Sequence, residues 1–319
     1  MDFGRLYTVI AAIFVLLICG MVLRKLKVIT DIASKNMSKL VITIAQPALI
    51  INSLISIDEF SSDMISDVIF VFVFGIILHF ILAIPAFFSV RFIKDIDERK
   101  ITEFALLYTN CGFIGLPVLD ALFGSVGTFL GAFYMITFHL TLWTWGISIF
   151  ARKRKDIKLT VKKIFLNYGT VPSFIGIILF IFKIALKDIF TIPEFVSTSL
   201  GYLASLCTPI SLLIAGALIW KIGLKALFVT PRLYYFSFIK LIAFPLATAF
   251  LVKLLGFDTT FIIFFTAITA LPSASMVSML AETYDINPEY SSLTVGISTL
   301  FSVVTIPIMV TVAQWVASL

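Results

Sequence analysis

Charged residues are scarce in this sequence. Only 13% of its 319 residues are Asp, Glu, Lys or Arg, and 60% are hydrophobic, whereas a typical soluble domain has roughly 25% charged residues. A soluble fold of this size could not cover its surface with so few polar side chains. The composition excludes a soluble protein and indicates an integral membrane protein.

The sequence also has few of the residues that carry catalysis, with two histidines and three cysteines. Cys19, Cys111 and Cys207 each lie in an apolar run, without the spacing of a metal site or a redox pair. The chain has no HExxH motif, no paired catalytic aspartates, no Ser/His dyad and no phosphate-binding loop. These absences argue against a membrane-embedded enzyme and an ATP-driven pump, and we expect neither a cofactor nor a bound metal.

Little of the chain is left over for an extramembrane domain. A helix needs about 20 apolar residues to cross a bilayer, and ten apolar runs with short loops use nearly the whole length. The first run precedes its positive cluster and has no A-x-A-like cleavage site, so we interpret it as a retained helix. The expected helices are Leu6–Leu23, Leu40–Ile57, Val68–Val90, Phe104–Phe123, Val126–Phe150, Ile164–Phe182, Phe195–Trp220, Leu233–Val252, Thr259–Ala281 and Tyr290–Val316.

The net charge of +6 is explained by where the cations lie. Of the 24 Lys and Arg residues, 19 fall in or beside the loops after predicted helices one, three, five and seven. Because short cytoplasmic loops are enriched in cations, this bias places both termini outside and the basic loop 152–164 in the cytoplasm, across a bacterial inner membrane. Among the loops on the predicted cytoplasmic side, only the acidic loop after helix nine lacks cations. Membrane lipid is the expected partner of the basic loops, and nucleic acid is not.

Polar residues followed by proline recur in the same order in the two halves of the chain, at offsets of 155 to 162 residues. The matched features are Gln46-Pro47 with Thr208-Pro209, His79 before Pro85 with Lys240 before Pro245, and Pro117 with Pro272. With five helices per half, the second half enters the membrane the other way up. We predict two inverted five-helix repeats, residues 1–151 and 165–319, with a substrate site near the midplane where interrupted helices meet.

The fourth helix has a polar centre. Asn110, Gly112, Gly115 and Pro117 lie within eight residues of an otherwise apolar run. Glycine relaxes the backbone and proline removes a donor, so the helix should unwind here. Unwound backbone in a bilayer must line a cavity or be buried in protein. An ordinary proline kink is the alternative.

The ninth helix has a second break, where Pro272 is followed by Ser273, Ser275 and Ser278. A half-helix that starts after the proline presents free N–H groups and the positive end of its dipole to an anion. Packing of small residues between helices explains the serines equally well.

Both segments carry a family resemblance. NCGFIGLPVL (Asn110–Leu119) resembles the crossover segment of the auxin efflux carrier family, which includes plant PIN-type carriers and bacterial permeases for malate and malonate. ALPSASMVSMLAETYDINPEYSSLTVGISTLFSVVTIPI (Ala270–Ile308) is similar to the C-terminal signature of that family. The short central loop is that of bacterial members, which argues against auxin itself as the substrate.

The resemblance implies an all-α membrane fold of ten transmembrane helices in two inverted repeats, with broken crossover helices 4 and 9. It further implies a scaffold of helices 1, 2, 6 and 7 and a moving unit of helices 3–5 and 8–10, in an elevator mechanism. Asn110 and Pro117 match the first crossover and Pro272 the second.

Lys240 is the one cation predicted to lie inside a helix. At roughly 1.5 Å per residue it lies about 12 Å from one flank and about 20 Å from the other, too deep for easy snorkelling. An intramembrane cation is a functional candidate. It either neutralises a substrate carboxylate or stands in for a coupling cation, and a structural ion pair is the alternative.

Five other polar residues are candidates with open alternatives. His79 and His139 are either hydrogen-bonded packing residues or proton carriers. Asp120 either closes the half-helix after the first break or faces the cavity. Gln46 and Thr208 either contact substrate or bond carbonyls that the following prolines leave free.

We therefore predict a secondary carrier that moves a small carboxylate, such as malate, malonate or an auxin-like acid, by alternating access. A channel or sensor on the same fold is the main alternative. The coupling ion, H+ or Na+, and a homodimeric state are left open. Substrate contacts are expected from Asn110, Gly112, Gly115, Pro117, Pro272, Ser273, Ser275, Lys240, Gln46 and Thr208, and ion coupling from His79, Asp120 or Lys240.

Overall fold

The computed structural model describes residues 3–56, 63–154, 162, 165–186, 191–223 and 230–319. The regular structure of these residues is helical, which confirms the all-α prediction. Most of the predicted basic loop 152–164 lies outside the described residues. Seven helices are long and apolar enough to cross a membrane: Gly4–Lys25, Asp31–Ile55, Met64–Ser89, Cys111–Ala151, Glu194–Ile222, Pro231–Leu254 and Pro288–Ser318. The ten-helix count stays a prediction.

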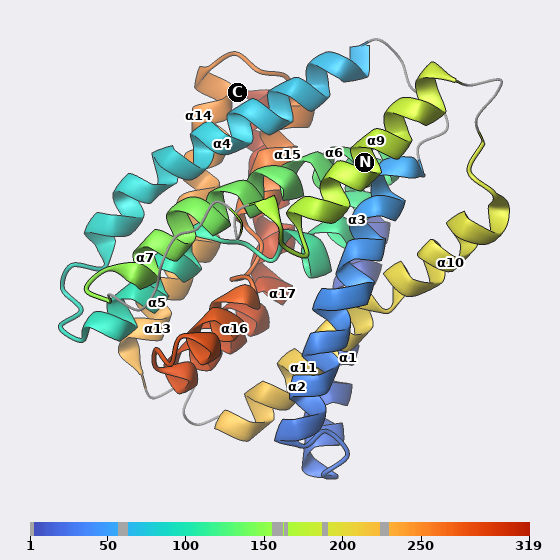
Figure 1. Ribbon diagram of the computed structural model, residues 1–319. Coiled ribbons are helices and arrows are strands. Elements are labelled where there is room, and N and C mark those ends of the chain that lie inside the picture. Colours follow the sequence, from blue (N-terminus) through green and yellow to red (C-terminus); the bar gives the residue numbers. More distant parts are fainter. Residues whose placement is uncertain (1–2, 57–62, 155–161, 163–164, 187–190, 224–229) are drawn as a thin grey trace.

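One set of helices, here the first helix group, lies on the right of Figure 1. Its core is α1 packed along α11, with α3 packed against α9 and α10. The backbones of α1 and α11 touch, because a Cβ on Gly216 would lie 2.0 Å from the carbonyl oxygen of Leu17. The members are α1 (Phe3–Lys25), α2 (Asp31–Leu40), η1 (Val41–Ala45), α3 (Gln46–Ile55), α9 (Thr170–Ala185), α10 (Glu194–Ser205) and α11 (Cys207–Ile222).

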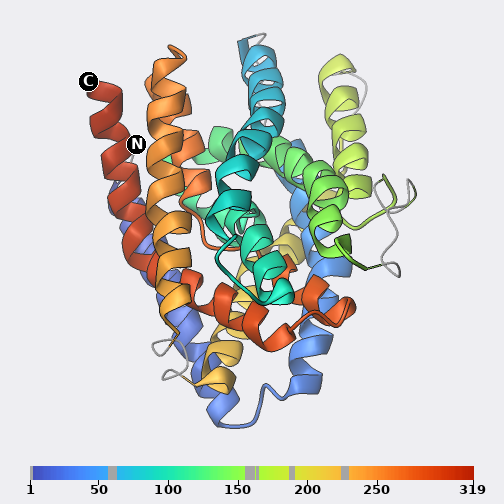
Figure 2. The same cartoon turned by 90° about the vertical axis from the view of Figure 1, so that its left-hand side faces the viewer.

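The second helix group fills the left of Figure 1 and holds both interrupted segments. Figure 2 shows α17 running beside α14, and α15 and α16 also pack on α17. The members are α4 (Asp63–Ser89), α5 (Ile96–Leu107), η2 (Cys111–Gly115), α6 (Leu116–Thr141), η3 (Leu142–Gly146), α7 (Ile147–Ala151), α13 (Pro231–Phe238), η4 (Ile239–Ala243), α14 (Phe244–Leu254), α15 (Thr259–Thr269), α16 (Met276–Thr283) and α17 (Pro288–Ser318).

Three of the wide π-helical turns directly precede a proline. Each of the turns η1, η2 and η4 is followed directly by a helix whose second residue is a proline. These prolines are Pro47, Pro117 and Pro245. Proline lacks an N–H and its ring crowds the preceding turn, so a wider turn relieves the clash. The predicted boundary near Gly124 is a kink within α6, where φ is +64°.

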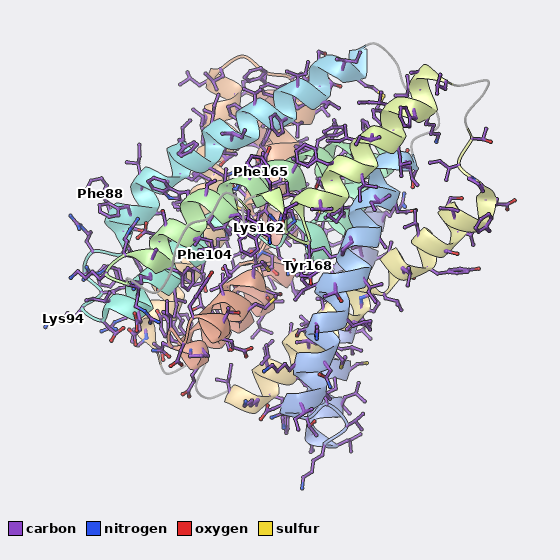
Figure 3. All side chains as sticks on the ribbon, viewed as in Figure 1. Phe88, Lys94, Phe104, Lys162, Phe165 and Tyr168 are labelled. Carbon is purple, nitrogen blue, oxygen red and sulfur yellow. The ribbon has the colours of Figure 1, made fainter. Side chains whose placement is uncertain are left out.

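Large apolar side chains cover the outer faces of the helices. Phe88 on α4, labelled in Figure 3, is 63% exposed, as is Ile84 one turn earlier. In water such a surface would aggregate, whereas hydrocarbon chains cover it at no cost. The outer faces therefore fit a lipid environment, and most of the polar residues discussed next are buried.

Candidate functional site

The two interrupted segments lie against each other. The first break runs between α5 and η2 and the second between α15 and α16. Thr109 and Ser273 form an antiparallel bridge. The Asn110 N–H donates to the Pro272 carbonyl at 2.8 Å, and the Ala274 N–H donates to the Tyr108 carbonyl at 2.9 Å. Each break thus satisfies backbone groups of the other, which lipid could not do.

Side chains complete the end of α5. The Ser273 hydroxyl donates to the Ala105 carbonyl at 2.9 Å. The Lys240 ammonium, only 1% exposed, donates to the Leu106 carbonyl at 2.8 Å. A cation at a helix C-terminus is favoured by the helix dipole. Lys240 therefore caps α5 beside the first break, in contact with protein rather than with the large cavity described below.

The start of η2 is formed by Asn110, whose side-chain oxygen accepts from the Phe113 N–H at 3.2 Å. Gly115, at the end of this turn, packs against the second break. A Cβ at this position would lie 2.7 Å from Cδ1 of Leu271. Pro117 lies at the start of α6, which continues directly from η2, and this wider turn accommodates its ring and its missing N–H.

Gln46 and Thr208 both reach from the first helix group to the second. The Thr208 hydroxyl donates to the Phe113 carbonyl at 2.9 Å. Gln46 Nε2 lies 3.2 Å from Nε2 of His139 on α6, and both residues are buried. Neither polar residue bonds a carbonyl of its own helix in these contacts.

His79 and Asp120, two of the predicted coupling residues, each bond to a protein group. His79 Nδ1 donates to the Gly75 carbonyl of its own helix at 2.8 Å, and its ring packs beside Tyr108 and Tyr134. Asp120 forms a salt bridge with Arg5 of α1 at 2.5 Å. This ion pair joins the two helix groups on the α1 N-terminal side.

A cavity of about 400 Å³ opens between the helix groups at the other end. Its walls come from α2, η1 and α11 on one side and η2, α16 and α17 on the other. Phe113 and Ser275 also line a small cavity of about 20 Å³ that contains Gln46, Asn110 and Gly112. The large cavity therefore ends at the paired breaks.

Four charged residues surround the cavity, and their formal charges cancel. Lys221 and Asp31 form a salt bridge at 2.9 Å within the first helix group. Lys35 on α2 and Glu282 on α16 line opposite walls. Net charge therefore does not favour an anion in the cavity. The positive end of the α16 dipole lies at its wall, where the Val277 N–H already donates to the Ala274 carbonyl and the Met279 N–H to the Ser275 carbonyl.

Of the predicted contacts, only Ser275 lines the large cavity. Sequence reasoning missed Ser211, Lys35 and Lys221 there. It weighed Ser278 equally as a ligand contact and as a packing residue, and did not include it among the expected substrate contacts. The sequence gives little indication of these residues. Ser211 is a single small residue in an apolar run, and the two lysines lie beside loops whose positive charge is already explained by the membrane topology.

Comparison with known families matches residues 6–310 to the family described as "Membrane transport protein". The chain is 24% identical over 302 residues to an uncharacterized transporter of Methanothermobacter thermautotrophicus. That alignment covers 94% of this chain and 95% of the relative. The chain therefore belongs to the membrane transport protein family, the auxin efflux carriers that its two interrupted segments resemble.

Proposed function

We propose that this membrane transporter is a secondary carrier of a small organic anion that works by alternating access. The observation that carries the proposal is the cavity of about 400 Å³, which is open at one end and stops at the paired breaks. At the opposite end the ion pair of Arg5 and Asp120 joins the two helix groups. A carrier that works by alternating access has one open and one closed end in each of its two access states.

The helix arrangement supports the predicted inverted repeat. The Cys111–Ala151 span divides at Gly124 into the end of the fourth and the whole of the fifth predicted helix. In this proposal the shorter apolar helices α9 and α15, the latter continued by α16 after the break, add to the seven long spans to give ten membrane crossings. In this proposal the first helix group is the scaffold and the second moves across it.

A carboxylate is the substrate chemistry that this cavity favours. Its volume lies within the roughly 300 to 1,000 Å³ of small-molecule sites. The N-terminus of α16 with Ser275 presents donors to an anion. Malate, malonate and auxin-like acids are of suitable size and charge.

Lys240 serves this mechanism as a fixed cation. Its bond to the Leu106 carbonyl favours the second of the two predicted roles, that of a charge standing where a coupling cation would otherwise bind. Its bond to the end of α5 holds the first break in its paired geometry. Direct neutralisation of the substrate by Lys240 has less support, because the residue does not line the large cavity.

A counterflow assay tests the proposed function. Proteoliposomes loaded with unlabelled malonate, malate or indole-3-acetate are placed in the same labelled acid. A carrier accumulates label transiently above equilibrium for at least one acid. A channel gives simple equilibration without overshoot, and chemical conversion of the acid would indicate an enzyme. Empty liposomes are the control, and no overshoot with any carboxylate would contradict the proposal.

A further inference from the structure

We propose that Ser211 and Ser278 bind the carboxylate of the transported anion from opposite walls of the large cavity. The inference rests on the proposed function and assigns the residues that hold the substrate. Ser211 comes from α11 of the first helix group and Ser278 from α16 of the second. The two hydroxyls therefore form a binding pair that is completed only when both groups face the same cavity.

Both hydroxyls are buried and have no hydrogen-bond partner among the described residues. The exposed fractions are 8% for Ser211 and 7% for Ser278. A buried hydroxyl without a partner is costly, so polar groups inside proteins are nearly always bonded. Two such groups on the walls of one cavity indicate a shared partner that enters it.

Two other buried serines of this chain, Ser173 and Ser298, behave differently. The hydroxyls of Ser173 and Ser298 donate to carbonyls three or four residues earlier in their own helices, at 2.8 to 3.0 Å. This local bond is the usual solution for serine in a membrane helix. Ser211 and Ser278 do not make it. Their hydroxyls need only a rotation about one side-chain bond to turn towards the cavity.

The surroundings of Ser278 favour an oxygen anion. It is the third residue of α16, so it lies in the first helical turn, beside the positive end of the helix dipole. In this turn the N–H groups of Val277 and Met279 already donate to the carbonyls of Ala274 and Ser275. Ser275 occupies the position before the helix, and its side chain makes no capping bond. A carboxylate here can accept from the α16 N-terminus and from Ser278, while its second oxygen accepts from Ser211.

The rest of the cavity suits an organic body behind the carboxylate. Phe113, Ile214 and Val295 supply apolar walls. The charged residues whose formal charges cancel belong to α2, to the end of α11 and to the last turn of α16. Recognition of the anionic head is therefore assigned to hydroxyl and backbone donors rather than to lysine.

Alanine variants test the hydroxyls directly. In the purified full-length protein, binding of the acid that gives the strongest counterflow is measured for Ser211→Ala, Ser278→Ala and the double variant. Loss of one hydrogen bond to a charged group should weaken binding about tenfold, and the double variant about a hundredfold. Ser237→Ala is the matched control, because Ser237 is equally buried and unpartnered but does not line the large cavity. Wild-type affinity in both single variants would overturn the proposal.

A second measurement does not depend on knowing the substrate. With Cys19, Cys111 and Cys207 replaced by alanine, Ser211→Cys and Ser278→Cys are exposed to the small anionic thiol reagent sulfonatoethyl methanethiosulfonate. Both thiols should be labelled, and a Ser237→Cys control should not. Absence of labelling at Ser211 and Ser278 would overturn the proposal even if counterflow succeeds. Labelling without counterflow for any acid would instead identify the carrier function as the part that fails.

Discussion

The two breaks differ in how much of their polar surface the protein itself uses. In the first, Asn110 caps η2 and the Tyr108 hydroxyl donates to the Thr141 carbonyl at 2.8 Å. In the second, Ser275 makes no capping bond and faces the large cavity. The two breaks therefore have different roles. The first stabilises the fold, whereas Ser275 in the second is available to bind a ligand.

Replacing the cation behind the first break should have the largest effect. Lys240→Met keeps the volume but leaves the Leu106 carbonyl without its partner, so the free energy of unfolding should fall by about 2 to 3 kcal/mol. Thermal unfolding of purified protein in detergent measures this change. Lys253→Met is the control, since Lys253 also donates to a helix-end carbonyl, that of Ala317, but at a partly buried position. Equal losses in both variants would contradict a special role for the first break.

Forcing the breaks apart should have the next largest effect. Gly115→Val places atoms where Leu271 now lies, so we expect a loss of about 1 to 3 kcal/mol of stability. Adding Leu271→Ala should restore part of it, because the smaller side chain makes room. Gly201→Ala is the control at a helical glycine with nothing within 4 Å. If the second substitution worsens the first, the two breaks do not pack as described.

This difference in roles predicts that one polar variant loses stability and the other loses ligand affinity. Asn110→Ala removes a cap and should cost about 1 kcal/mol of stability. Ser275→Ala removes no intramolecular bond, so stability should stay unchanged while affinity for the transported acid falls severalfold. Unfolding and binding are measured on both proteins. Asn110→Asp, which keeps an acceptor oxygen, should retain stability. Reversed outcomes would exchange the roles of the two breaks.

The smallest effect is expected at the closed end. The ion pair of Arg5 and Asp120 is partly exposed, with side chains 52% and 37% accessible, so it contributes about 1 kcal/mol at most. Arg5→Ala should shift the protein modestly towards the opposite access state and slow labelling of Ser211→Cys by up to about fivefold. The exchanged pair Arg5→Asp with Asp120→Arg should restore the rate. An unchanged rate in Arg5→Ala would show that this contact does not hold the end closed.

Sequence reasoning located the breaks better than it located the ligand surface. Asn110, Gly112, Gly115 and Pro117 weaken a helix through local chemistry, and local chemistry is readable from one segment. The break at Pro272 was found in the same way. The seven long apolar helices likewise follow from composition alone.

The contacts of these residues were out of reach because they join distant segments. The depth of Lys240 was predictable, but its acceptor lies 134 residues earlier, at the end of a helix whose end depends on the break. The partner of Asp120 is Arg5, 115 residues away. Ser211 and Ser278 stand out because they lack a hydrogen-bond partner and also line the large cavity, and both features are properties of the folded chain.

The most direct test is a cryo-EM structure of the full-length protein with the acid that gives the strongest counterflow. The account predicts density for the carboxylate at the N-terminus of α16, within hydrogen-bond reach of Ser211 and Ser278. Density instead beside Lys240 and His79, or outside the cavity between the helix groups, would contradict it.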